Sequence, residues 1–125
     1  MIIVLIGTIS SCSKPTDEEI ISKNVKNFVE TMYTGDMDKA MNYCTEPAAA
    51  SLEFLKTFIN EDIKLIMETS NPSAEIISID INEEKTEAEV ACMLKNVFDL
   101  SSMAVIEETS TWFTLIKVEG KWLID

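Results

Sequence analysis

The 125-residue sequence contains no histidine, no arginine and no glutamine. Histidine is the usual general base near neutral pH and the commonest metal ligand, so its absence makes many catalytic and metal sites harder to build. Ten lysines stand against 22 acidic residues, which gives a net charge of -12. Nucleic-acid-binding proteins normally carry a basic surface, so this composition argues against that class and favours a soluble, acidic domain.

Cysteine is also scarce, and its three residues, Cys12, Cys44 and Cys92, lie far apart without a CxxC pair. That spacing does not fit a structural zinc site, and no metal ion or cofactor is expected. Cys44 and Cys92 stand at apolar-face positions, where a free cysteine behaves as a small hydrophobic residue. We expect both to be free thiols, and a disulfide between them is the alternative.

The chain begins with an uncharged segment in which residues 1–9 are apolar apart from Thr8. This run is far shorter than the roughly 20 apolar residues of a membrane-spanning helix, and it is typical of the apolar region of a secretory signal. The usual basic residues before that region are missing, so the natural start is expected upstream of Met1. Residues 9–12, Ile-Ser-Ser-Cys, resemble the lipobox of bacterial lipoproteins, in which the cysteine is lipidated after cleavage.

The lipobox resemblance implies a signal peptide at 1–11, a lipidated tether at 12–16 and one domain at 17–125. It makes Cys12 the lipidation site and places the protein in the bacterial cell envelope. Ser13, in the second mature position, resembles outer-membrane sorting in Gram-negative cells. The alternative is that the apolar run is a buried first strand and the cysteine an ordinary thiol, but the run neither alternates nor ends in strand-to-turn residues.

Helical periodicity predicts three helices in the first half of the domain. Thr16 opens a capping box, and apolar residues then recur at helical spacing until Gly35. Asp36 is expected to cap a short second helix that ends near Pro47, and a third helix is predicted over roughly 48–69.

After Pro72 the apolar period changes from helical to two. Alternation places Ile77, Ile79 and Ile81 on one face of a first strand, and tight turns separate it from its successors. Helices gathered before an antiparallel sheet predict an α+β domain, with three N-terminal helices packed on a curved four-stranded sheet. The strands are expected at 74–82, 86–94, 105–118 and 121–125.

Residues spread over this domain resemble the small secreted members of the nuclear-transport-factor-2-like superfamily. These proteins have cone-shaped α+β folds, and many are lipoproteins of unknown function, so the resemblance implies a fold and little about activity. It implies a turn role for the glycine of the last hairpin and a core role for the tryptophan after it. The residues that carry the resemblance are Phe28, Tyr33, Gly35, Asp36, Ala40, Tyr43, Gly120, Lys121 and Trp122.

Enzymes with this cone-like fold, such as ketosteroid isomerase, resemble one another in using an Asp or His base with Tyr or Asp donors. This chain offers only carboxylates and tyrosines, and we assign no catalytic residue. Tyr33, Tyr43, Glu108 and Trp112 are the candidates for a ligand pocket. A carboxyl held against an indole would have its pKa raised, whereas the favoured alternative is that Glu108 is a solvated charge. Both tyrosines are read first as core residues whose hydroxyls reach water.

The third predicted strand has large apolar residues on both faces. Trp112, Thr114 and Ile116 point one way, and Phe113 and Leu115 point the other way. We expect one face to lie under the helices and the face of Phe113 and Leu115 to be covered by a second copy in a symmetric homodimer. The rival explanation is that the sheet curls enough to bury both sets in one subunit.

Three hypotheses of function follow. The favoured one is a lipid-anchored envelope protein whose non-catalytic cone domain binds a small apolar ligand or a partner protein. The second is a histidine-free isomerase or dehydratase of the same fold, and the third is a structural assembly module.

The first testable prediction concerns Cys12. Replacing it with Ala is expected to move the protein from the detergent phase to the aqueous phase, because each acyl CH₂ contributes about 0.8 kcal/mol of membrane binding. The measurement is detergent-phase partitioning of the protein made in a bacterial host, with Cys44→Ala as the control that keeps the anchor. Unchanged partitioning of Cys12→Ala would contradict the lipoprotein assignment.

Overall fold

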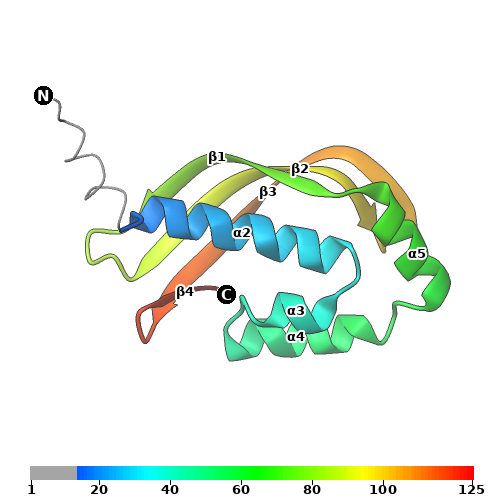
Figure 1. Ribbon diagram of the computed structural model, residues 1–125, viewed down its shortest axis with the longest axis horizontal. Coiled ribbons are helices and arrows are strands. Elements are labelled where there is room, and N and C mark those ends of the chain that lie inside the picture. Colours follow the sequence, from blue (N-terminus) through cyan, green and yellow to red (C-terminus); the bar gives the residue numbers. More distant parts are fainter. Residues whose placement is uncertain (1–13) are drawn as a thin grey trace, which may run out of the picture.

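The computed structural model describes residues 14–125, in which helices pack against one face of an antiparallel sheet. The sheet arches over α2, with α3 and α4 on the opposite side of that helix and α5 at the far end of the sheet (Figure 1). This arrangement confirms the predicted α+β cone. The elements are α2 (Asp17–Tyr33), α3 (Met37–Met41), α4 (Glu46–Lys56), α5 (Glu61–Ser70), β1 (Ser73–Ile81), β2 (Glu87–Asp99), β3 (Ala104–Val118) and β4 (Lys121–Ile124).

Helix α2 is the longest helix and begins at the predicted capping box. The hydroxyl of Thr16 accepts a hydrogen bond from the backbone N–H of Glu19 at 3.2 Å, and the Glu19 carboxylate accepts from the N–H of Thr16 at 2.8 Å. Past the helix end, Gly35 adopts a φ of 89°, which side chains disfavour. None of the helices in residues 14–125 combines the length and apolarity needed to cross a membrane.

The prediction of one helix over 48–69 was wrong, because the structure has two helices there, α4 and α5. Thr57 ends α4, and the side chain of Asn60 accepts a hydrogen bond from the N–H of Ile63 at 2.8 Å to start α5. Asparagine is a strong N-cap because its side chain satisfies a free N–H of the first turn. The domain therefore has four described helices, and the break lets α5 turn back against β2 (Figure 1).

The four strands form a meander in the order β1-β2-β3-β4, as predicted. One detail differs in β1, where the pairing with β2 shifts between Ile76 and Ser78. This bulge turns Ile77 to the outer face, where 57% of the residue is exposed, and gives the inner position to Ile76. The expectation that Ile77 and Ile79 share one face was wrong, because a bulge shifts the alternation by one residue.

The inner face of β3 carries Phe113 and Leu115. Leu115 is fully buried opposite Ala88, and the ring of Phe113 packs edge-on against Phe28 of α2, with centroids 5.7 Å apart. The expectation that Phe113 and Leu115 form the outer face was therefore wrong. Trp112 lies on the outer face instead, where 66% of its surface is exposed.

The short strand β4 ties the end of the sheet to the helices. The indole N–H of Trp122 donates to the Asp17 carboxylate at 3.1 Å, and the ammonium of Lys117 lies 5.5 Å from the ring centre. Farther along, the N–H of Thr45 donates to the carbonyl of Ile124 at 2.8 Å. The core role implied for Trp122 is confirmed, since 2% of this residue is exposed.

Candidate functional site

A cavity of about 480 Å³ lies where α2, α4 and the end of the sheet come together. Its volume falls in the range of about 300–1,000 Å³ that is typical of small-molecule sites. Most of its lining atoms are carbon, contributed by aromatic and aliphatic side chains. The lining residues are Phe28, Met32, Tyr33, Cys44, Pro47, Ala48, Ser51, Leu52, Phe113, Ile124 and Asp125.

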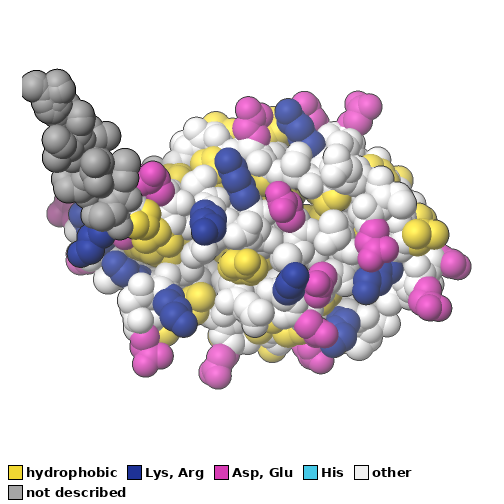
Figure 2. Space-filling model, in the orientation of Figure 1, with side chains coloured by type: hydrophobic (Ala, Val, Ile, Leu, Met, Phe, Trp, Pro, Cys, Tyr) yellow, Lys and Arg dark blue, Asp and Glu magenta, His cyan; other side chains and the backbone are white. Residues whose placement is uncertain are grey.

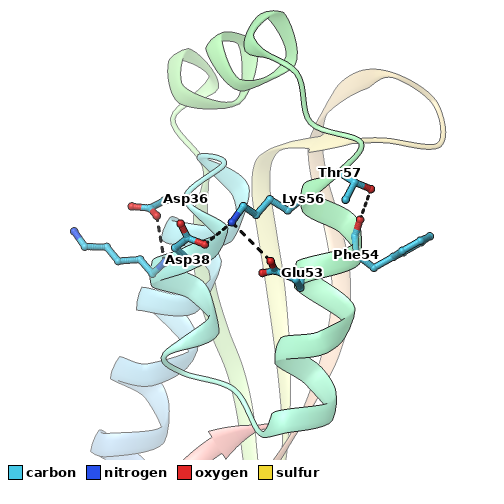
Figure 3. Close-up of polar contacts among 7 residues, drawn as sticks. Asp36, Asp38, Glu53, Phe54, Lys56 and Thr57 are labelled. Atoms are coloured by element: carbon cyan, nitrogen blue, oxygen red, sulfur yellow. Dashed lines mark hydrogen bonds and ion pairs between the residues drawn. The ribbon is translucent and has the colours of Figure 1, made fainter.

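Helix α4 forms one wall of the cavity, and polar contacts join it to α3 (Figure 3). The ammonium of Lys56 binds the carboxylate of Asp38 at 2.8 Å and lies 3.9 Å from that of Glu53. The hydrogen bond with Asp38, and then the charges of Asp38 and Glu53, raise the pKa of Lys56. The Phe54 side chain extends away from α3, so it does not contribute to this contact (Figure 3).

The polar groups around the cavity are neutral or already engaged. Burial, and secondarily the charge of Asp99, raises the pKa of the Tyr33 phenol. Burial also raises the pKa of the Cys44 thiol to about 11, and this thiol donates to the carbonyl of Ala40 at 3.4 Å. The carboxylate of Asp125 accepts from the hydroxyl of Thr45 at 2.8 Å.

These surroundings suit the binding of an apolar group more than proton transfer. Tyr33 and Cys44 both stay protonated near neutral pH, because burial disfavours their charged forms. A general acid and base pair normally needs one group that titrates near the working pH. A carbon-lined cavity whose phenol and thiol stay protonated, and whose Asp125 carboxylate is already hydrogen-bonded, provides a place to hold a ligand and little to transform it.

No family model matches the chain, and no curated protein matches it either. Several solved structures do match the chain. An NTF2-like (nuclear-transport-factor-2-like) protein with a cystatin-like fold from Novosphingobium aromaticivorans aligns over 99% of this chain and 85% of its own, with a TM-score of 0.59 and 13% identity. The chain has the NTF2-like cone fold.

Two further structures support the NTF2-like cone. One is described as a candidate NTF2-like transpeptidase from Campylobacter jejuni, and it aligns over 87% of this chain and 97% of its own, with a TM-score of 0.53 and 20% identity. The other, a protein of unknown function from Nostoc punctiforme, aligns over 89% of each chain with a TM-score of 0.53 and 13% identity. Identities this low establish the fold alone.

The structure brings one of the four predicted pocket residues, Tyr33, to the cavity of this cone. Tyr43 lines a separate groove between α2 and β4. Glu108 and Trp112 lie on the outer face of β3, opposite Lys95 and Ala91 of β2. Glu108 is exposed there and is not enclosed in a dry pocket beside an indole. Residue 12, the predicted lipidation site, lies outside the described residues.

Sequence reasoning missed most of the cavity wall, including Phe28, Leu52 and Phe113. Their apolar character predicts a place in the core, and nothing local distinguishes a core residue that borders a space from one that fills it. The space lies between residues of α2, α4, β3 and β4, which are far apart in the sequence, so local sequence patterns do not predict it.

Two hollows along α2, of about 600 and 570 Å³, are larger, but charged side chains such as Glu19 and Lys23 line both of them. Acidic and basic side chains are interspersed over the face seen in Figure 2, with apolar atoms in small areas between them. Within residues 14–125, no group of three or more Cys, Asp or Glu side chains is arranged to hold a metal ion. Cys44 and Cys92 are free, buried thiols, as expected.

Proposed function

We propose that this NTF2-like domain is a non-catalytic binding module whose cavity receives an apolar group of a small ligand or of a partner protein. The observation that carries the proposal is the lining of the cavity, where Phe28, Leu52 and Phe113 surround about 480 Å³. Transfer of apolar surface out of water into such a site is favourable by about 25 cal/mol per Å². Binding there needs no ionised group.

The enzyme alternative receives less support from the same cavity. A histidine-free isomerase would need a carboxylate free to take a proton beside a donor, and Asp125 already accepts a hydrogen bond from Thr45. Glu108, the other candidate carboxylate, is on the opposite face of the sheet. The groups that line the cavity therefore favour recognition over chemistry.

We also propose that the domain is held at a membrane of the bacterial envelope through lipidated Cys12. The support is the lipobox pattern of residues 9–12 together with the start of α2 at Asp17, five residues after the cysteine. So short a tether would keep the beginning of α2 close to the lipid surface, since an extended chain spans at most about 3.6 Å per residue. The opposite end of α2, where the cavity lies, would then face away from the membrane.

A homodimer through the outer face of the sheet completes the proposal. Trp112 and Ile77 are 66% and 57% exposed on this face, with Val118 nearby in β3. An exposed indole in the middle of a sheet is a large apolar surface, and a two-fold copy of the same face would remove it from water.

A tryptophan placed at the cavity mouth tests the binding proposal. Ser51 is exposed on α4 and lines the cavity, so Ser51→Trp is expected to occupy the space without disturbing the core. We expect the affinity for the neutral dye 1-aminoanthracene to fall at least about tenfold, which corresponds to about 1.4 kcal/mol. Ala50→Trp, on the neighbouring exposed position outside the lining, is the matched control. Equal dye binding by both variants, or no binding by the wild type, would refute the proposal.

A charge on the outer face tests the homodimer. Trp112→Lys is expected to give a folded monomer in light scattering, while the wild type and Phe54→Lys, a variant of an exposed aromatic on α4, stay dimeric. A wild type that remains monomeric at the highest concentration measured would contradict the dimer.

A further inference from the structure

We propose that an exposed row of residues on α4 binds an amphipathic helix of a partner protein, one whose apolar face is flanked by lysine or arginine. The row consists of Pro47, Ser51, Phe54 and Phe58 and is called the α4 row below. This inference rests on the proposed function, because the α4 row continues the wall of the same cavity. It goes further by naming the partner class, a basic amphipathic helix.

The members of the α4 row follow one another along one side of the helix. They are three or four positions apart, and residues at this spacing are neighbours on a helix surface. The rings of Phe54 and Phe58 pack edge-on, with centroids 5.1 Å apart. The N–H of Phe58 donates to the carbonyl of Leu55 at 3.0 Å, so the turn beyond α4 continues the helical path. At 1.5 Å per residue, the row is about 16 Å long.

All four members of the α4 row are open to solvent. Phe54 and Phe58 are 67% and 55% exposed, and Pro47 and Ser51 are exposed as well. The Phe54 side chain extends away from α3, which is the main neighbour of α4 among the described elements (Figure 3). Contiguous exposed apolar surface marks sites of interaction. The two rings contribute little to the core of the domain and are available to a partner.

The α4 row begins at the mouth of the cavity. Pro47 and Ser51 line the cavity, and Phe54 and Phe58 follow them on the same side of α4. The cavity mouth and the pair of rings therefore form one track along the helix. This track is about three helical turns long, so an elongated partner can use it along its whole length.

An amphipathic helix matches this track better than an extended chain does. Its apolar side chains recur every three or four residues, which is the spacing of the α4 row, so the side chains of two such helices can interdigitate. An extended peptide on the same surface would leave backbone N–H and C=O groups without partners, whereas a helix satisfies these groups internally. Recognition of a helix through an apolar face and a groove is a recurring mode of binding.

Acidic residues surround the α4 row. Glu46 and Glu53 are exposed and seven positions apart, which places both on one flank of the row. Asp125 lines the cavity at the opposite flank. Glu61 and Asp62 follow the row in the first turn of α5. Basic residues beside the apolar face of a partner helix would complement these carboxylates.

The nearest lysine does not remove this excess of negative charge. Between residues 40 and 63 the only lysine is Lys56, and its ammonium binds the carboxylate of Asp38 on α3 at 2.8 Å. The acidic surroundings disfavour two other occupants of the row. The anionic surface of a membrane would be repelled, and a second copy of this chain would bring identical acidic flanks together.

The experiment measures the binding of the labelled peptide LKKLLKLLKKLLKL, whose leucines form one face of a helix, by fluorescence anisotropy. A salt concentration well above physiological screens non-specific attraction. One control peptide has the same residues with the leucines spread around the helix, and another has Glu in place of each Lys. The protein variants are Phe54→Ser/Phe58→Ser and the matched control Leu65→Ser/Ile66→Ser, which alters two exposed apolar residues of α5. Circular dichroism verifies that each variant is folded.

The expected result is that the wild type and Leu65→Ser/Ile66→Ser bind the peptide alike. Phe54→Ser/Phe58→Ser and both control peptides should weaken binding at least about tenfold, because the apolar contact or the charge complementarity is lost. Phe54→Ser/Phe58→Ser should still bind 1-aminoanthracene as the wild type does, since neither ring lines the cavity.

Three results would overturn the inference. Equal binding of the peptide by Phe54→Ser/Phe58→Ser, or equal binding of the peptide with spread leucines, would show that charge alone attracts it. Loss of the dimer in Phe54→Ser/Phe58→Ser would show that a second copy covers the row. Binding of the Cys12→Ala protein to neutral phosphatidylcholine vesicles, lost when both Phe→Ser changes are added, would assign the row to a lipid surface.

The dye separates this inference from the proposed function. Dye binding without peptide binding would refute the helix partner and leave the proposed function standing. Peptide binding through the α4 row without dye binding would refute the proposed role of the cavity and keep the helix partner. A protein that binds neither probe would refute both.

Discussion

The packing of α2 on the inner face of the sheet is the contact on which the rest of the structure depends. Ile21, Val25 and Val29 are fully inaccessible to solvent, and so is Val90 on β2. Each such side chain contributes about 1.5–3 kcal/mol relative to exposure in water. The curvature of the sheet around this helix determines where every other helix can lie.

Helices α3 and α4 cannot reach the inner face as closely as α2 does, because α2 lies between them and β1 (Figure 1). They contact the far end of β4 instead, through the hydrogen bond of Thr45 with Ile124. Between this contact and the ring pair of Phe28 and Phe113, the inner face is left without a covering helix. The cavity is therefore a consequence of the layer arrangement.

The sequence predicts the order and class of the elements well, because the capping box at Thr16 and the change of period after Pro72 are local signals. It fails where two local signals compete. Phe58 and Ile59 continue the apolar spacing of a helix, and only the capping by Asn60 breaks it. Both faces of β3 are apolar, so the sequence of this strand does not show which face points inward. The pairing of Leu115 with Ala88, which is distant in the sequence, sets the inner face.

The candidate site is less predictable than the fold for a related reason. Tyr33 was identified because a phenol at the end of an apolar helix face is a chemical signal. Phe28, Leu52 and Phe113 carry no such signal, because each is an ordinary apolar residue. Each borders the cavity only because no neighbouring helix or strand packs over it on that side. A cavity is a property of the spacing between elements, and that spacing comes from tertiary packing.

The central claim is that an open, apolar space exists between α2, α4 and β3. Diffraction from a crystal of the protein pressurised with xenon tests it most directly, because xenon enters dry apolar cavities and is located by its electron density. The account predicts a xenon atom in contact with Phe28, Leu52 and Phe113. A space filled by rearranged side chains, with no xenon among these three residues, would contradict it.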